Sequence, residues 1–83
     1  MILLPMQSRM ARAALGWGVR ELAAAAKVSI DTVARFERGD ELKERTIEAL
    51  RRTLEAAGVK FIDENGGGAG VRLRKPPKEK SRK

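Results

Sequence analysis

The chain has 83 residues, which is enough for one small domain. It contains no cysteine and no histidine, which excludes disulfides, thiolate nucleophiles and metal sites built from these residues. The formal net charge is +7, and a basic chain suits a polyanionic partner. Residues 1–58 carry ten Lys and Arg against eight Asp and Glu, whereas residues 59–83 carry eight against three. Charge alone therefore does not distinguish a nucleic-acid partner from an anionic membrane surface or a solubilising tail.

The first predicted helix follows a short apolar segment. Residues 1–6 are too few to span a bilayer or to form the apolar region of a signal peptide, and we expect a frayed or loosely docked arm. A helix is predicted over residues 6–15, with an apolar stripe formed by Met6, Met10, Ala14 and Leu15. Gly16 and Gly18 break this helix, and Trp17 between them is expected to anchor the core.

Two further helices are predicted on either side of a tight turn. The second helix covers residues 19–26, and Glu21 in its first turn suits the helix dipole. Ser29 is a natural N-cap for the third helix over residues 30–38, which Gly39 ends in the left-handed conformation.

The rest of the chain changes from helical to strand periodicity. A fourth helix is predicted over residues 44–57, with Ile47, Leu50, Leu54 and Ala57 on its apolar side. Short alternating segments at 59–63 and 70–74 flank a glycine-rich turn and predict a β-hairpin. A lone hairpin is marginal in water, so this one should pack on something. Residues 75–83 contain two prolines and little apolar surface, and we predict a disordered basic tail.

The spacing of small and apolar residues over 19–38 predicts a helix-turn-helix. Two helices that cross steeply need a small residue at the crossing, and Ala23 is at that position. They also need an apolar side chain that fills the turn, and Val28 is at that position. Val33 and Phe36 then face inward from the third helix. This leaves one exposed polar and cationic face that fits the major groove of B-DNA, made of Asp31, Thr32, Arg35 and Arg38.

The same region resembles a known family. The sequence has Arg12, then Leu15-Gly16-Trp17, then Arg20-Glu21-Leu22-Ala23, then Val28-Ser29, and finally an unbroken run from Thr32 to Gly39. In this combination, residues 9–39 resemble the Cro/C1-type (Xre family) helix-turn-helix. The resemblance implies a mainly α fold: a four-helix, lambda-repressor-like domain over residues 6–58, followed here by the hairpin. It also implies sequence-specific binding of double-stranded DNA, and a structural ion pair between Arg12 and Glu37.

Three departures from the family pattern bear on the expected interface. Lys27 stands in the turn where the family usually has Gly, and a left-handed Lys costs on the order of 1 kcal/mol. Val19 stands where the family often has Gln, so Arg20 or the helix N–H groups are expected to replace a phosphate contact. The usual fifth helix is replaced by the hairpin, and some small Cro-like repressors dimerise through C-terminal strands.

Arg35 is the residue we expect to read a base, because bidentate contact of Arg with guanine is the commonest specific contact. Thr32 either reads a base edge or bonds locally to the backbone. Asp31 either accepts a hydrogen bond from cytosine or stabilises the helix dipole. Ile30 either touches a thymine methyl group or packs on the second helix.

The phosphate contacts are expected from residues around the third helix. Ser29 is primarily an N-cap, although its position also permits a phosphate contact. The basic candidates are Arg20, Arg38, Lys27 and Arg45. No second carboxylate, His, Cys or phosphate-binding loop joins Glu37 in a catalytic constellation, so we predict no enzyme, metal, cofactor or small-molecule ligand.

The sequence therefore predicts a cytoplasmic DNA-binding regulator from a bacterium, phage or mobile element, most simply a dimeric repressor of an inverted-repeat operator. The alternative is an antitoxin or adaptor that uses the same fold to bind a protein. We expect two copies to pair through the hairpin at 59–74, and its apolar side chains would form the interface: Phe61, Ile62, Val71 and Leu73. The alternative is that the hairpin folds back on its own helices, and that the protein binds as a monomer or pairs through the helix at 44–57.

Overall fold

The computed structural model describes residues 2–74 and contains four helices followed by a two-stranded antiparallel hairpin. The helices are α1 (Pro5–Leu15), α2 (Val19–Ala26), α3 (Ile30–Glu37) and α4 (Glu44–Ala56). The strands are β1 (Val59–Ile62) and β2 (Gly70–Leu73). The mainly α fold with a C-terminal hairpin is therefore as predicted, with each boundary within one residue. The predicted tail at 75–83 lies outside the described residues.

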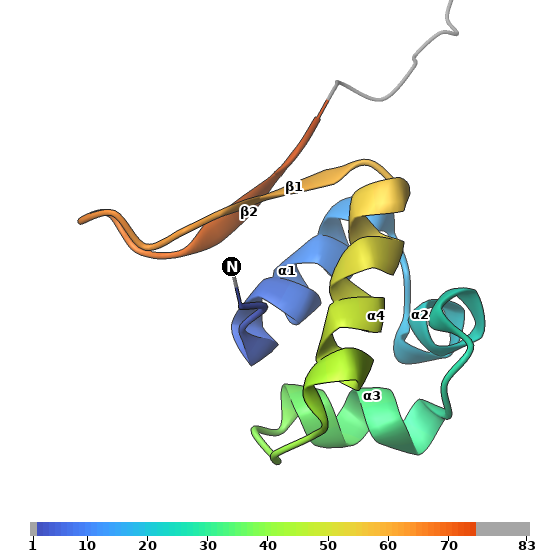
Figure 1. Cartoon of the computed structure of the whole chain (residues 1–83). Coiled ribbons are helices and arrows are strands. Elements are labelled where there is room, and N and C mark those ends of the chain that lie inside the picture. Colours follow the sequence, from blue (N-terminus) through green and yellow to red (C-terminus); the bar gives the residue numbers. More distant parts are fainter. Residues whose placement is uncertain (1, 75–83) are drawn as a thin grey trace, which may run out of the picture.

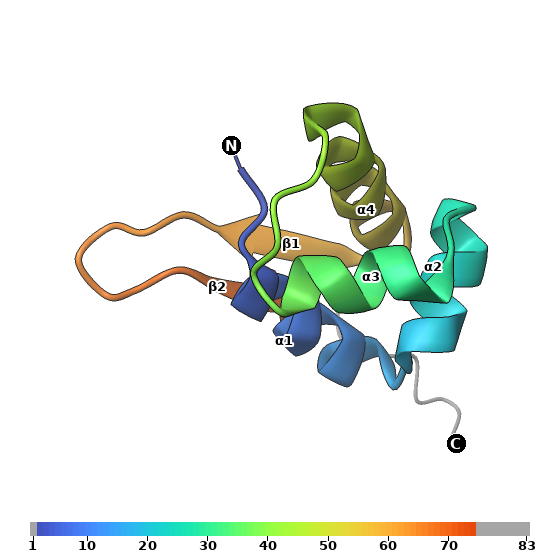
Figure 2. The ribbon, with the colours of Figure 1, turned by 90° about the horizontal axis from the view of Figure 1, so that it is seen from below.

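The arrangement leaves α3 and the hairpin on opposite sides of the molecule (Figure 1). α1 and α4 lie between them, and α2 packs against one end of α3. Seen from below, α3 crosses the face nearest the viewer and the hairpin projects sideways beyond the helices (Figure 2). The third helix thus keeps one side free of other elements in the described part of the chain.

The helix boundaries follow from local chemistry. Pro5 occupies the first turn of α1, where a missing N–H costs nothing, so the helix begins one residue earlier than expected. Gly18 caps α2 and its N–H donates to Glu21 Oε1 at 2.9 Å. Gly39, with φ of 100°, turns the chain after α3. Lys27 ends α2 with φ of 60°, which is the left-handed conformation expected for the residue in this turn.

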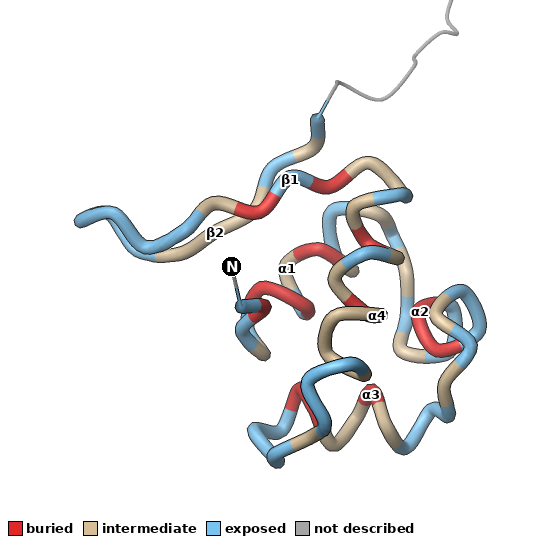
Figure 3. Tube along the Cα trace, in the orientation of Figure 1, coloured by how far each residue is buried: buried red, intermediate tan, exposed pale blue. Residues whose placement is uncertain are grey.

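One core joins the helices and the hairpin. The predicted inward residues Leu22, Ala23, Val33 and Phe36 are buried there, as are Leu50 and Leu54 of α4 and Val59 and Phe61 of β1. The side chains of Trp17 and Val28 are half-buried and pack against this core. Buried residues lie where the helices face one another, while the far end of the hairpin is exposed (Figure 3).

Two predictions for the N-terminal region are wrong. Leu3 is only 2% exposed and belongs to the core, so the opening segment is firmly anchored at this residue rather than frayed or loosely docked, while Ile2 and Leu4 beside it are exposed. The buried side of α1 is formed by Gln7, Ser8 and Ala11, whereas Met6 of the predicted stripe is 51% exposed. The polar side chains of α1 are buried because their hydrogen bonds are satisfied by other elements, which an apolar pattern does not reveal.

Gln7 connects the start of α1 to both strands. Its side chain is 1% exposed, and its Oε1 accepts from the Leu4 N–H at 3.0 Å. Its Nε2 donates to the carbonyl oxygens of Ile62 at 3.2 Å and Gly70 at 3.1 Å, which are paired across the hairpin. A single amide therefore caps a helix and holds the hairpin against it.

The hairpin packs on its own helices, which corrects part of the predicted dimer interface. Val59 pairs with Leu73 and Phe61 with Val71, so these four side chains share one face of the sheet. Phe61 is buried by its own chain, and Val71 and Leu73 are half-buried against the same core. The prediction that Phe61 contributes to the dimer interface is therefore wrong. Ile62 is on the opposite face and is half-buried.

Replacing Gln7 by Leu is expected to lower the free energy of unfolding by about 2–4 kcal/mol, because unpaired backbone groups that are removed from water cost roughly 1–3 kcal/mol each. Chemical denaturation measures the loss, and amide exchange in residues 59–73 should accelerate. The control is Met6→Ala on the same helix, which should change stability by less than about 0.5 kcal/mol. Equal effects of the two substitutions would show that Gln7 does not hold the hairpin.

Candidate nucleic-acid interface

The exposed side of α3 carries the residues that the sequence assigns to DNA. Val33 and Phe36 are buried on the inner side of the helix. Residues on the other side of the helix therefore face away from the core. Ile30 is 46% exposed, so nearly half of this apolar residue is open to a partner. Asp31 in the first turn is exposed as well. The predicted recognition surface is thus an uncovered helix face in the described part of the chain.

Ser29 and Thr32 are engaged with each other at the start of α3. Ser29 Oγ accepts from the Thr32 N–H at 3.0 Å, which is an N-cap contact. The two hydroxyl oxygens are also hydrogen-bonded at 2.8 Å. The Thr32 hydroxyl therefore bonds locally to the Ser29 side chain rather than to the backbone as expected, and any contact of this hydroxyl with DNA must compete with Ser29.

Arg35 and Arg38 lie one turn apart on α3 and approach the same carboxylate. The distance from Arg35 Nε to Asp40 Oδ2 is 3.6 Å, and from Arg38 Nη2 to the same oxygen it is 3.0 Å. The side chains of Arg35 and Arg38 are 43% and 61% exposed, so both remain accessible. The sequence analysis did not assign Asp40 a role and missed this contact.

The other proposed phosphate contacts are exposed but are not drawn together by hydrogen bonds among the described residues. Lys27 is in the turn that leads into α3, and Arg20 is in the first turn of α2. Arg45 is in the first turn of α4, after the loop that follows α3. These three side chains are exposed and free to meet a phosphate backbone.

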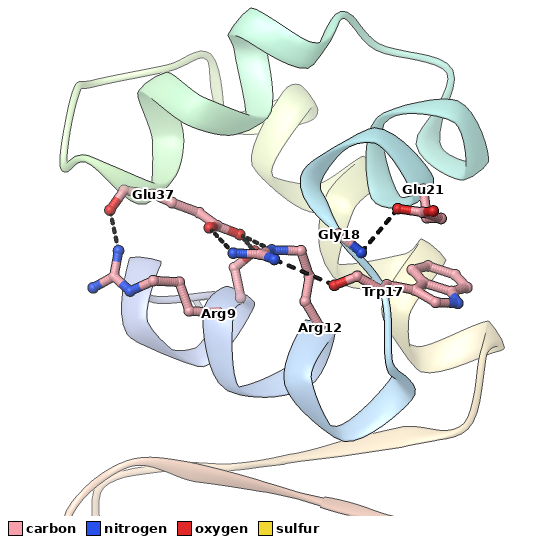
Figure 4. Close-up of polar contacts among 7 residues, drawn as sticks. Arg9, Arg12, Trp17, Gly18, Glu21 and Glu37 are labelled. Carbon is pink, nitrogen blue, oxygen red and sulfur yellow. Dashed lines mark hydrogen bonds and ion pairs between the residues drawn. The ribbon is translucent and has the colours of Figure 1, made fainter.

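The C-terminal end of α3 is anchored by Glu37 (Figure 4). Arg12 of α1 donates to both carboxylate oxygens, from Nη2 to Oε1 at 2.7 Å and from Nε to Oε2 at 2.9 Å. This is the ion pair that the family resemblance implies. The same guanidinium also donates to the Trp17 carbonyl oxygen at 3.3 Å. One Arg thus ties α1, the segment before α2 and the end of α3.

Two further contacts at Glu37 were missed by sequence analysis. Ser8 Oγ donates to Glu37 Oε2 at 2.6 Å, and its side chain is fully buried. Arg9 donates from Nη1 to the backbone carbonyl oxygen of Glu37. The spacing of Ser8, Arg9 and Arg12 at i, i+1 and i+4 was a usable signal, because all three share one side of α1.

The electrostatics of Glu37 favour its ionised form. Burial alone would raise the pKa of the Glu37 carboxyl, but hydrogen bonds from Arg12 and Ser8, together with the charges of Arg12 and Arg9, outweigh it and lower the pKa below its ordinary value. The pKa of Arg12 is raised, chiefly by its hydrogen bond to Glu37. Because the Glu37 carboxylate is fully hydrogen-bonded to α1, it holds α3 in place and is not free to take part in chemistry.

The described residues contain no cluster of three or more acidic, His or Cys side chains that could hold a metal ion. None of the helices in residues 2–74 combines the length and apolar character needed to cross a bilayer. Comparison with protein-family models and with curated proteins finds no match to this chain.

Replacing Glu37 by Gln is expected to lower the free energy of unfolding at pH 7 by about 2–3 kcal/mol. This is below the ~3–5 kcal/mol for breaking a fully buried pair, because the Arg12 side chain keeps 19% exposure. Because the pKa of Glu37 is lowered by folding, its stabilisation is present above the unfolded value of about 4.3 and is lost as the pH falls through the folded value.

The difference between the wild type and Glu37→Gln should therefore shrink in denaturation experiments below about pH 4. Glu41→Gln is the matched control, since Glu41 is exposed and has no ion pair within the described chain. A Glu37→Gln deficit that stays constant from pH 7 to pH 3 would contradict the assignment.

Proposed function

We propose that this protein is a sequence-specific regulator that binds double-stranded DNA through α3 and is not an enzyme. The observation that carries the proposal is an eight-residue helix with an uncovered polar and cationic face, held at its end by the Glu37 contacts. Eight helical residues span about 12 Å, comparable with the width of the major groove. The fold and the placement of Arg35 support this use of α3.

The rigidity of α3 supports sequence recognition rather than simple charge attraction. Base reading requires a side chain to be held at a defined position and angle, whereas phosphate attraction does not. The N-terminal end of α3 is capped by Ser29, and its C-terminal end is tied to α1 by Ser8, Arg9 and Arg12. Arg35 projects from a helix fixed at both ends, which suits bidentate contact with guanine.

Two copies of the chain would read an inverted repeat. Within the described residues the sheet has two strands, so each strand keeps one edge without a neighbour. The hairpin projects sideways from the helices (Figure 2), so a second copy paired along it need not cover α3. Two α3 helices about 34 Å apart would enter successive major grooves, with half-sites roughly 10 base pairs apart.

Repression is the simplest regulatory outcome of such binding. A dimer on an operator occludes polymerase or another DNA-binding protein without needing a cofactor or a small-molecule ligand. The site of action would be the cytoplasm of a bacterium, where the DNA is located.

Arg35→Ala should reduce discrimination between a selected site and random DNA by about 1–3 kcal/mol, the range for a bidentate guanine contact. Duplexes selected from a random pool by the wild type supply the site, and competition binding measures the discrimination. Arg52→Ala removes the same charge from α4, where that side chain is 76% exposed, and should leave discrimination unchanged. Equal discrimination by the wild type and Arg35→Ala would refute the role of Arg35.

Ile62→Glu should weaken the dimer at least tenfold while leaving the monomer folded, because Ile62 is on the outer face of the hairpin and outside the core. Sedimentation equilibrium gives the dissociation constant and circular dichroism checks the fold. Ile2→Glu is the control, because Ile2 is also apolar and is 71% exposed. A dimer with unchanged affinity in Ile62→Glu would exclude the hairpin as the interface, and a monomeric wild type would exclude the dimer.

A further inference from the structure

Asp40 is placed to pair with both arginines of the proposed DNA-reading face. Its Oδ2 is 3.0 Å from Arg38 Nη2 and 3.6 Å from Arg35 Nε, so a single oxygen serves both guanidinium groups. The contact with Arg38 is also a hydrogen bond. A carboxylate oxygen between two guanidinium groups has the charge and acceptor geometry of a DNA phosphate oxygen.

The position of Asp40 is fixed by the backbone rather than by chance contact of a mobile side chain. The Asp40 N–H donates to the Arg35 carbonyl oxygen at 3.0 Å, and the Gly39 N–H donates to that of Phe36 at 3.0 Å. Gly39, with φ of 100°, makes this reversal of the chain possible. The carboxylate therefore returns to α3 beside the residues with which it pairs.

We propose that Asp40 is a specificity-determining residue, an internal competitor for DNA phosphate that holds Arg35 and Arg38 and releases Arg35 only to a preferred base sequence. The proposal rests on the DNA-binding function proposed above. An exposed ion pair is a weak interaction, whereas a bidentate contact between Arg and guanine is strong enough to discriminate one base from another.

The difference in strength between these two interactions separates binding to random DNA from binding to a preferred base sequence. On random DNA the arginines stay with Asp40 and add little to affinity. On a preferred site Arg35 leaves its 3.6 Å contact with Asp40 for guanine, while Arg38 keeps its hydrogen bond to Asp40. Asp40 thereby weakens binding to random DNA more than binding to the preferred site.

The test compares the full-length wild type with Asp40→Asn and Glu41→Gln. Both substitutions remove one negative charge from adjacent exposed positions, but Glu41 has no ion pair among the described residues. Asn keeps the backbone N–H that bonds to Arg35, so the turn is preserved. Each protein is titrated with a random-sequence duplex and with a duplex selected by the wild type, at several salt concentrations.

Asp40→Asn should bind random DNA about two- to fivefold more tightly than Glu41→Gln does, as expected from the loss of an exposed ion pair. Its salt slope on random DNA should be steeper by about 0.9 for each arginine that reaches a phosphate. Its discrimination between the selected and random duplexes should fall by a similar factor.

Equal affinities and slopes for Asp40→Asn and Glu41→Gln would overturn the proposal and leave the DNA-binding function standing. An equal gain on both duplexes would also overturn it, because Asp40 would then act as a charge without selectivity. Absence of DNA binding by the wild type at low salt would refute the function itself, and this inference with it.

Discussion

The orientation of α3 depends on a single buried carboxylate. Glu37 accepts two hydrogen bonds from Arg12 and one from Ser8, while its backbone carbonyl accepts one from Arg9. All three donors are on α1, so the first helix sets the angle at which the third is presented. A buried charge is tolerated only when it is fully paired, and no buried side-chain nitrogen or oxygen among the described residues lacks a partner. The proposed recognition face therefore owes its rigidity to polar contacts behind it.

The helices and the hairpin could be predicted because their signals are local. Ser29 and Gly39 mark boundaries by their own conformational preferences, and Val33 and Phe36 show helical spacing. The interior of α1 could not be predicted in this way. Gln7 and Ser8 are polar, and they are buried because their partners come from 29 to 63 residues away. No periodicity within one helix contains that information.

The candidate site was predicted in outline and missed in detail for a related reason. Arg35 and Arg38 were placed on the exposed face by excluding the inward positions, and the structure has them there. Asp40 was missed because its approach to the arginines depends on the turn at Gly39 rather than on helical spacing. The hairpin was predicted correctly, but the burial of Phe61 was not. Its burial depends on how far the helices extend beneath the hairpin, which composition does not report.

The amide of Gln7 also constrains when the domain can be completed during synthesis. Its Leu4 partner is made at once, but the carbonyl groups of Ile62 and Gly70 come 55 and 63 residues later. A nascent chain that ends before residue 70 has all four helices but leaves this amide without two of its acceptors. The contact that joins the first helix to both strands can therefore form only after the ribosome has released the second strand.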